Sequence, residues 1–259
     1  MYSTYERKNI YKSADENTLK AIFDYSEGYK RFLDNGKTER ETVEYTVEML
    51  EKAGYKEYKL GDKINPHDKL YFNNRGKALF IVKAGSAEKI KEGVRILVAH
   101  VDSPRLDLKQ VPLYEKSELA FLKTHYYGGI KKYQWVTMPL ALHGVICTKD
   151  GKTVNVCLGE DESEPVFVIS DILPHLAQKQ MKETASDFIP GENLDLIVGS
   201  ENPVKDSKEK EAAKKNILKL LKEKYGIEEE DFGSAELEVV PAGKSRDLGL
   251  DRSLILAYG

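Results

Sequence analysis

The sequence predicts an α/β fold in two parts, and three observations lead to that prediction. Two helix-start signals precede short strand-forming runs in the first hundred residues, one apolar run ends directly in a histidine, and the pattern changes after residue 110. With 259 residues, of which 41% are hydrophobic, the chain can bury the core of one large or two modest domains.

The first elements are two helices, because Ser13–Glu16 and Thr38–Glu41 both have the capping-box form. Each hydroxyl and each glutamate can satisfy a free N–H group at a helix start. The first helix has an apolar stripe, the second has a shorter one that Gly54 ends, and both are expected to pack on a sheet. The stripes are Leu19, Ile22, Phe23, Tyr29 and Phe32, then Val43, Val47 and Leu50.

Strands follow at residues 70–72, 78–82 and 94–99, where β-branched and aromatic residues gather. The last run reads VRILVA and is apolar apart from Arg95. A continuous apolar run is typical of a central strand that is buried on both faces. We therefore expect residues 94–99 to form the central strand that leads into His100.

From about residue 111 to 242 the order of strand-like and helical segments differs from that of the first hundred residues, which predicts a second domain. It contains several strand-like runs, a turn at Asp150-Gly151, a charged helix over 207–225 and an alternating strand over 235–240. The lysines near 205–224 could attract an acidic partner. An apolar stripe of Ala212, Ile217, Leu220 and Leu221 instead favours a solvated helix face.

The two cysteines, Cys147 and Cys157, are too few for a disulfide framework. They flank the predicted turn, so a disulfide across that hairpin is one alternative. If Asp150 and Gly151 are the two loop residues, Cys147 faces Val154 and Cys157 faces Gly144 instead. Two reduced, packed cysteines are the interpretation that we favour.

Composition excludes several classes of partner. The 40 basic and 43 acidic residues give a net charge of −3 and are well mixed, so neither nucleic acid nor a membrane surface is expected to bind.

The first thirty residues are charged throughout and lack the pattern of a signal peptide. No apolar run approaches the roughly 20 residues that cross a bilayer. We expect a cytoplasmic protein.

The sharpest chemical signal is LVAHVDSP, in which His100 and Asp102 are two residues apart. In a strand this spacing places both side chains on one face, which looks into the ligand crevice at the carboxyl end of an open α/β sheet. The imidazole could bind a divalent metal while the carboxylate accepts the other ring N–H. The same spacing is also typical of a structural histidine bonded to a nearby aspartate.

The segment AHVDSPRLDLK resembles the metal-binding segment of the aspartyl aminopeptidase and aminopeptidase I family of zinc peptidases, in particular its bacterial aminopeptidase I branch. Three further segments resemble the family in the same order. They are THYYGGIKKYQW at 124–135, PLALHGV at 139–145 and VVPAGKSRDLGLDRSLILAYG at 239–259. A shared order makes chance similarity improbable.

The resemblance implies a peptidase-type α/β domain, in its N-terminal half, with an inserted mainly-β dimerisation domain. The first half would be residues 1–108, the insert 109–242 and the return segment 243–259. It also implies homo-oligomers, from dimers to dodecamers, that release N-terminal amino acids from peptides. A complete site of this kind holds two divalent metals, zinc with cobalt or manganese as alternatives.

Carried over residue by residue, His100 resembles a ligand of one metal and Asp102 its orienting catalytic partner. His175 falls where family members send a histidine into a neighbouring subunit's site to bind substrate, although a packed histidine is the alternative. No chemical role is assigned to His125 or His143, which we expect to be structural, and His67 is expected in an exposed loop.

The sequence departs from the family after Gly259, where the family continues into a bridging aspartate, a pair of glutamates and later ligands. One histidine cannot hold two metals, since a catalytic zinc normally has three protein ligands. We therefore expect an incomplete fragment that is inactive alone. The alternative is a non-catalytic oligomerisation or binding module. A thiol or serine hydrolase finds little support, because neither cysteine lies near a histidine motif and the sequence has no Gly-x-Ser-x-Gly elbow.

Overall fold

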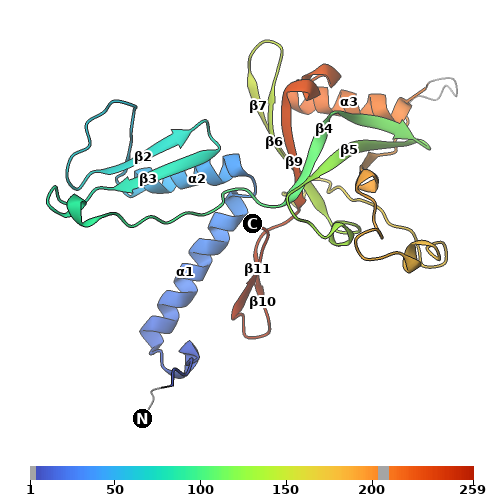
Figure 1. The fold of residues 1–259 in the computed structure, drawn as a ribbon. Helices are drawn as coiled ribbons and strands as arrows, with labels where there is room; N and C mark the ends of the chain where they lie inside the picture. Colours follow the sequence, from blue (N-terminus) through green and yellow to red (C-terminus); the bar gives the residue numbers. More distant parts are fainter. Residues whose placement is uncertain (1–3, 204–209) are drawn as a thin grey trace.

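The computed structural model describes residues 4–203 and 210–259 and has a mixed α/β fold (Figure 1). The helices are α1 (Glu16–Asn35), α2 (Glu39–Lys52) and α3 (Ala212–Tyr225). The strands are β1 (Lys56–Glu57), β2 (Lys69–Asn74), β3 (Ala78–Lys83), β4 (Arg105–Lys116), β5 (Leu119–Tyr127), β6 (Leu140–Cys147), β7 (Thr153–Leu158), β8 (Leu196–Gly199), β9 (Ala235–Pro241), β10 (Arg246–Leu248) and β11 (Leu254–Leu256). Among the described residues, no helix is long and apolar enough to cross a membrane.

The helix α2 begins as the sequence predicts. Thr38 accepts a hydrogen bond from the Glu41 N–H, and the Glu41 side chain accepts one from the Thr38 N–H, which completes the capping box. At the other end, Gly54 has a φ of 82°, and the Gly54 and Tyr55 N–H groups bond Glu51 and Leu50. This Schellman ending confirms Gly54 as the stop signal.

The predicted start of α1 is wrong by two residues. Asp15 is the N-cap and accepts from the Thr18 N–H at 2.7 Å, whereas Ser13 ends a short 3₁₀ turn over Ile10–Lys12. The helix also does not pack on a sheet. It buries only Leu33, contacts α2 through the Phe32 and Tyr45 rings, and projects away from both larger sheets (Figure 1).

The first sheet is small and has the order β1-β2-β3. The strand β2 pairs antiparallel with β3 from Lys69↔Lys83 to Asn74↔Ala78, which confirms the predicted strands at 70–72 and 78–82. The Tyr71 hydroxyl on β2 donates to Glu51 on α2, so the helix is held against this sheet. Phe80 and Ile81 on the edge strand β3 remain exposed.

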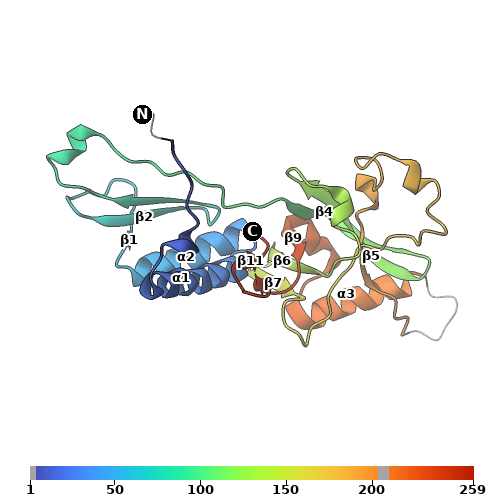
Figure 2. The same cartoon turned by 90° about the horizontal axis from the view of Figure 1, so that it is seen from below.

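The second sheet has six antiparallel strands in the order β7-β6-β9-β4-β5-β8, and it carries most of the core. The helix α3 covers part of this sheet (Figure 2). The predicted strand over 235–240 is β9, and the predicted helix over 207–225 is α3, although residues 207–209 lie outside the described part.

The prediction of a buried central strand at 94–99 is wrong for this structure. Residues 93–103 form no strand, and Ile96, Leu97 and Val98 are 75%, 100% and 90% exposed. The segment runs extended between the small sheet and the six-stranded sheet (Figure 2). A strand needs a neighbour for its N–H and C=O groups, and no described strand pairs with these residues.

The hairpin β6–β7 corrects the predicted cysteine register. The strand β6 ends at Cys147 and β7 begins at Thr153. The Thr148 N–H donates to the Lys152 carbonyl, so the connection is longer than two residues. Cys147 therefore faces Thr153, and Cys157 faces His143. Both cysteines are free, which confirms the reduced state, but both are exposed and not packed.

Candidate functional site

His100 and Asp102 lie side by side just before β4. The Nδ1 atom of His100 is 3.1 Å from Oδ1 of Asp102, so the two side chains are hydrogen-bonded although no strand places them. The imidazole is 91% exposed and the carboxylate 28% exposed. The pair is therefore open to solvent and is not sealed in apolar packing.

Tyr127, at the end of β5, fixes the carboxylate of this pair. Its hydroxyl donates to Oδ2 of Asp102 at 2.8 Å, which leaves Oδ1 for His100. The hydrogen bond from Tyr127, followed by the one from His100, lowers the pKa of Asp102, so the group is ionised near neutral pH. The sequence reasoning missed Tyr127, although it lies within the segment THYYGG that resembled the family.

Arg105 anchors the chain immediately after the pair. It is 7% exposed, and its guanidinium lies 4.2 Å from the centre of the Tyr127 ring. Its Nε atom is 2.8 Å from Asp107 and 2.9 Å from Glu238 on β9, and its Nη1 atom is 3.3 Å from Glu39 on α2. One buried cation thereby joins three elements at the base of the site.

Burial changes how Glu238, beside Arg105, titrates. Burial, reinforced by the charge of Glu39, raises the pKa of Glu238 to about 8 even though Arg105 opposes the shift. The attraction of Glu238, Asp107 and Glu39 outweighs burial and raises the pKa of Arg105. Near neutral pH the cluster therefore holds a proton on Glu238 and a charged guanidinium.

Contacts from distant segments support the chain between Asp102 and β4. The Tyr258 hydroxyl donates to the Pro104 carbonyl at 3.1 Å. Gly128 has a φ of 74°, and a Cβ there would lie 3.4 Å from the Pro104 side chain. The pair Gly128-Gly129 follows Tyr127 directly, so its backbone freedom lets the chain turn closely beside the site.

The donor atoms present do not form a complete zinc site. His100 supplies one imidazole, and Asp102 already accepts two hydrogen bonds. In the described residues no group of three or more His, Cys, Asp or Glu side chains could hold a metal. A catalytic zinc normally has three protein ligands, so this part of the chain can provide at most some of them.

A second cluster joins α2 to the six-stranded sheet. His143 on β6 is 3% exposed and places Nδ1 2.7 Å from Glu41 and Nε2 2.9 Å from Glu160. The ammonium of Lys37 lies 2.6 Å from Glu160 and also donates to the carbonyls of Pro241 and Gly243. His143 thus bridges two parts of the fold, a structural role consistent with the sequence prediction.

The remaining three histidines are distant in sequence from the His100–Asp102 pair. His175 lies in an exposed turn after Leu173, which is itself 66% exposed, so it is not the packed histidine that was the alternative. His125 is exposed on β5 and stacks on the Tyr126 ring at 5.5 Å. His67 lies in an exposed loop, as predicted, with a φ of 67°.

Comparison with known families gives one match over most of the chain. The family model described as "Aminopeptidase I zinc metalloprotease (M18)" matches residues 32–259. The "Probable M18 family aminopeptidase 1" of Clostridium acetobutylicum is 54% identical over 258 residues, which cover 98% of this chain and 55% of that protein. The protein of the same name from Thermotoga maritima is 44% identical over 256 residues, covering 98% of this chain and 54% of that one.

Solved structures agree with this match. The crystal structure of aminopeptidase I from Clostridium acetobutylicum has a TM-score of 0.86 and 49% identity, covering 98% of this chain and 56% of that one. The M18 aminopeptidase from Thermotoga maritima has a TM-score of 0.87 and 42% identity, with 97% and 54% covered. A Saccharomyces mApe1 dodecamer, at 20% identity and a TM-score of 0.65, shares the fold. The chain spans about half the length of the curated relatives that it matches.

Proposed function

Because this chain belongs to the aminopeptidase I zinc metalloprotease family (M18), we propose that it contributes one half of a metal-dependent aminopeptidase, which releases N-terminal amino acids from peptides. The observation that carries the proposal is the exposed His100 imidazole held at Nδ1 by Asp102. A cytoplasmic location, expected from the sequence, stays part of this proposal.

In this proposal His100 is a zinc ligand and Asp102 orients it. With Nδ1 bonded to the carboxylate, Nε2 is the ring nitrogen left for a metal, and a carboxylate partner raises its basicity. Tyr127 supports the role of Asp102 because it holds the second carboxylate oxygen. When bound, zinc supplies a polarised water and a Lewis acid for peptide hydrolysis, and the residues here hold the metal's first imidazole in place.

We propose that the other ligands come from polypeptide corresponding to the part of the relatives' length that this chain does not span. The fully exposed Leu97 and its apolar neighbours support this, since side chains of that kind are normally covered in a finished domain. In the completed protein, residues 94–99 would be covered by that polypeptide, close to His100 and Asp102.

We extend the proposal to the domain boundaries that the sequence predicts, and the six-stranded sheet supports them. Residues 1–108 and 243–259 would belong to the peptidase domain, and 109–242 to an inserted dimerisation domain, because β4 to β9 form one sheet over 105–241. The exposed turn that carries His175 supports the idea that this histidine reaches the site of a neighbouring subunit in a homo-oligomer. Dimers and dodecamers are the assemblies expected.

Complementation tests the proposal. This chain would be produced together with the remaining C-terminal half of the Clostridium acetobutylicum relative, and zinc content and release of amino acids from unblocked peptides would be measured. The mixture should retain zinc and hydrolyse peptides, whereas either half alone should not. His100→Ala should abolish both, with His125→Ala as the matched control. Full zinc retention by His100→Ala would contradict the proposal.

A non-catalytic oligomerisation module is the second candidate. It is favoured by the absence, in the described residues, of any three side chains that could hold a metal. The two candidates separate in the same experiment. A module of this kind would assemble with its partner half or with itself, but substitution of His100 would change neither assembly nor metal content.

A further inference from the structure

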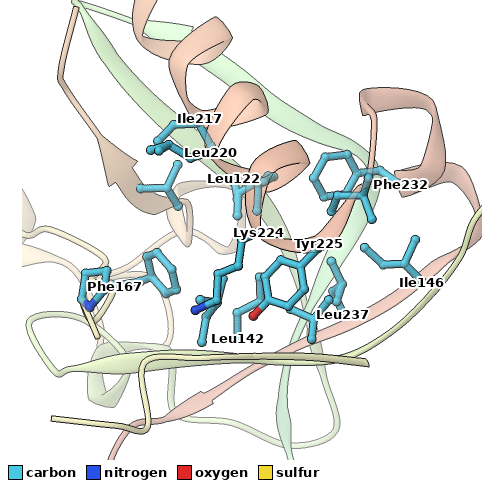
Figure 3. Close-up of a pocket in the computed structure, with 16 residues that line it drawn as sticks. Leu122, Leu142, Ile146, Phe167, Ile217, Leu220, Lys224, Tyr225, Phe232 and Leu237 are labelled. Atoms are coloured by element: carbon cyan, nitrogen blue, oxygen red, sulfur yellow. The ribbon is translucent and has the colours of Figure 1, made fainter. Parts of the chain in front are cut away.

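A cavity of about 210 Å³ lies between α3 and the six-stranded sheet (Figure 3), and His100 is not among the residues that line it. Fourteen of the sixteen residues around it are apolar, and only Lys224 and Tyr225 carry polar groups. Five strands of the sheet contribute side chains, including Leu122 of β5, Leu142 of β6 and Leu237 of β9. Ile217 and Leu220 close the cavity from the helix (Figure 3).

The volume is large enough for a ligand. An apolar cavity of roughly 150 Å³ stays dry and binds benzene, so 210 Å³ holds in proportion about eight carbon atoms. Leu220 is 49% exposed and the Lys224 side chain 47% exposed, which places an entrance beside the last turns of α3. A small apolar molecule can therefore enter without unfolding the sheet.

The two polar residues define the end of the ligand. Lys224 and Tyr225 are adjacent, with Nζ 5.6 Å from the ring centre, and Figure 3 shows both side chains reaching down from α3 toward the sheet. Lys224 donates to Glu164, and the Tyr225 hydroxyl donates to the Cys157 carbonyl at 3.0 Å. Lys224 keeps further N–H donors, and the Tyr225 oxygen keeps its capacity to accept.

Charge decides between a neutral and an anionic ligand. Glu164 already neutralises Lys224, and this pair, with the Gly159 N–H, lowers the pKa of Glu164, so the carboxylate is ionised. A ligand carboxylate near Lys224 would face that second negative charge. A hydroxyl group suits the entrance better, because it can accept from Lys224 and donate to Tyr225 without adding charge.

We propose that the cavity under α3 binds a neutral alcohol or phenol with an apolar body of about eight carbons. This site is independent of the metal site and does not rest on the proposed peptidase function. It fits the general pattern of small-molecule sites, which combine an apolar lining with a few polar groups that fix orientation.

The test compares two probes of equal carbon count, 2-phenylethanol and phenylacetate, titrated into the whole chain and followed by NMR. The alcohol should give saturable shifts confined to residues around the cavity, such as Leu122, Ile217 and Phe232. Phenylacetate should bind at least about tenfold more weakly, a difference of about 1.4 kcal/mol. Shifts that do not saturate, that lie elsewhere, or that are equal for both probes would overturn the proposal.

Two variants sharpen the result. Leu220→Trp should fill the entrance and weaken alcohol binding by at least about tenfold, whereas Leu173→Trp, at an exposed leucine outside the cavity, should not. Lys224→Met keeps the apolar lining, so it should still bind ethylbenzene but lose the preference for 2-phenylethanol over it. Unchanged alcohol binding in Leu220→Trp, or an unchanged preference in Lys224→Met, would refute the site.

Discussion

The Nδ1 atom of His143 on β6 lies 2.7 Å from Oε1 of Glu41 on α2, so a buried imidazole links the capping box of a helix to the six-stranded sheet. Burial alone would lower the pKa of His143. The hydrogen bonds and charges of Glu160 and Glu41 outweigh burial and raise the pKa to about 9. Glu41 and Glu160 respond with lowered pKa values, so all three groups are charged near neutral pH.

This arrangement predicts a loss of stability as pH rises. The folded pKa of His143 exceeds its unfolded value of 6.5, so its contribution is complete below pH 6.5 and is lost as pH rises through about 9. That contribution is on the order of 3 kcal/mol, since one pKa unit corresponds to 1.36 kcal/mol. Urea unfolding at several pH values measures it.

His143→Gln is the matched variant for that measurement. The stability difference between the unsubstituted chain and His143→Gln should be greatest near pH 6 and should shrink toward pH 9. Glu238, whose pKa of about 8 also makes stability fall with rising pH, is present in both proteins and cancels in the difference. A difference that stays constant from pH 6 to pH 9 would contradict the assignment.

Substitution of Asp102 or Tyr127 should weaken zinc binding in the complemented protein without unfolding it. Loss of a residue that orients a metal ligand typically lowers metal affinity by about 10- to 100-fold. We expect Asp102→Asn to fall in that range and Tyr127→Phe to have a smaller effect, because Tyr127 acts through Asp102. Competition with a chelator measures the affinity, and His125→Ala is the control.

Thr38→Ala should destabilise the chain by about 1 kcal/mol, the usual cost of losing a helix N-cap hydroxyl. Ser13→Ala is the control, because Ser13 resembles a cap in the sequence but Asp15 performs that role. It should change stability by less than about 0.5 kcal/mol. Thermal unfolding measures both variants, and equal effects would show that the assigned caps are wrong.

Gly144→Ala should damage the pairing of β6 with β9. Gly144 has a φ of 136°, and a Cβ at this position would overlap the carbonyl oxygen of Glu236. Because backbone atoms cannot move aside cheaply, we expect a loss of about 3 kcal/mol or an insoluble protein. Gly233→Ala, where a Cβ meets nothing within 4 Å, is the control. Its urea midpoint should stay close to that of the unsubstituted chain.

Trypsin should cut the isolated chain after Arg95 much faster than after Arg105. Arg95 is exposed in the unpaired segment, whereas Arg105 is 7% exposed and held by three carboxylates. Exposed unpaired segments are preferred sites of proteolysis. Mass spectrometry of early fragments measures the order of cleavage. Addition of the complementing half should protect Arg95, and continued rapid cleavage there would argue against its burial.

Local signals in the sequence predicted the elements that depend on local chemistry. The Thr38 capping box and the Gly54 ending of α2 both act within a few residues, and both predictions are confirmed. The cap of α1 failed because Ser13 and Asp15 can both serve, and the 3₁₀ turn before the helix uses Ser13.

Features that depend on distant partners could not be predicted in the same way. The run at 94–99 has the composition of a buried strand, but strand formation requires a neighbour and none of the described strands pairs with it. His100 and Asp102 are near in sequence, so their contact was predictable. Tyr127 was not, because it reaches Asp102 only through the antiparallel pairing of β4 and β5 at Arg105↔Tyr127.

The burial of Arg105 among carboxylates limits how the sequences of related proteins can change. Glu39 and Glu238 come from separate places in the chain, yet both lie against the guanidinium of Arg105. Replacing Arg105 alone would remove the buried cation that lies against both Glu39 and Glu238, and breaking a buried ion pair in this way typically costs about 3–5 kcal/mol. We expect these positions to change together across homologues or not at all, so that variation in a helix is tied to variation beside His100 and Asp102.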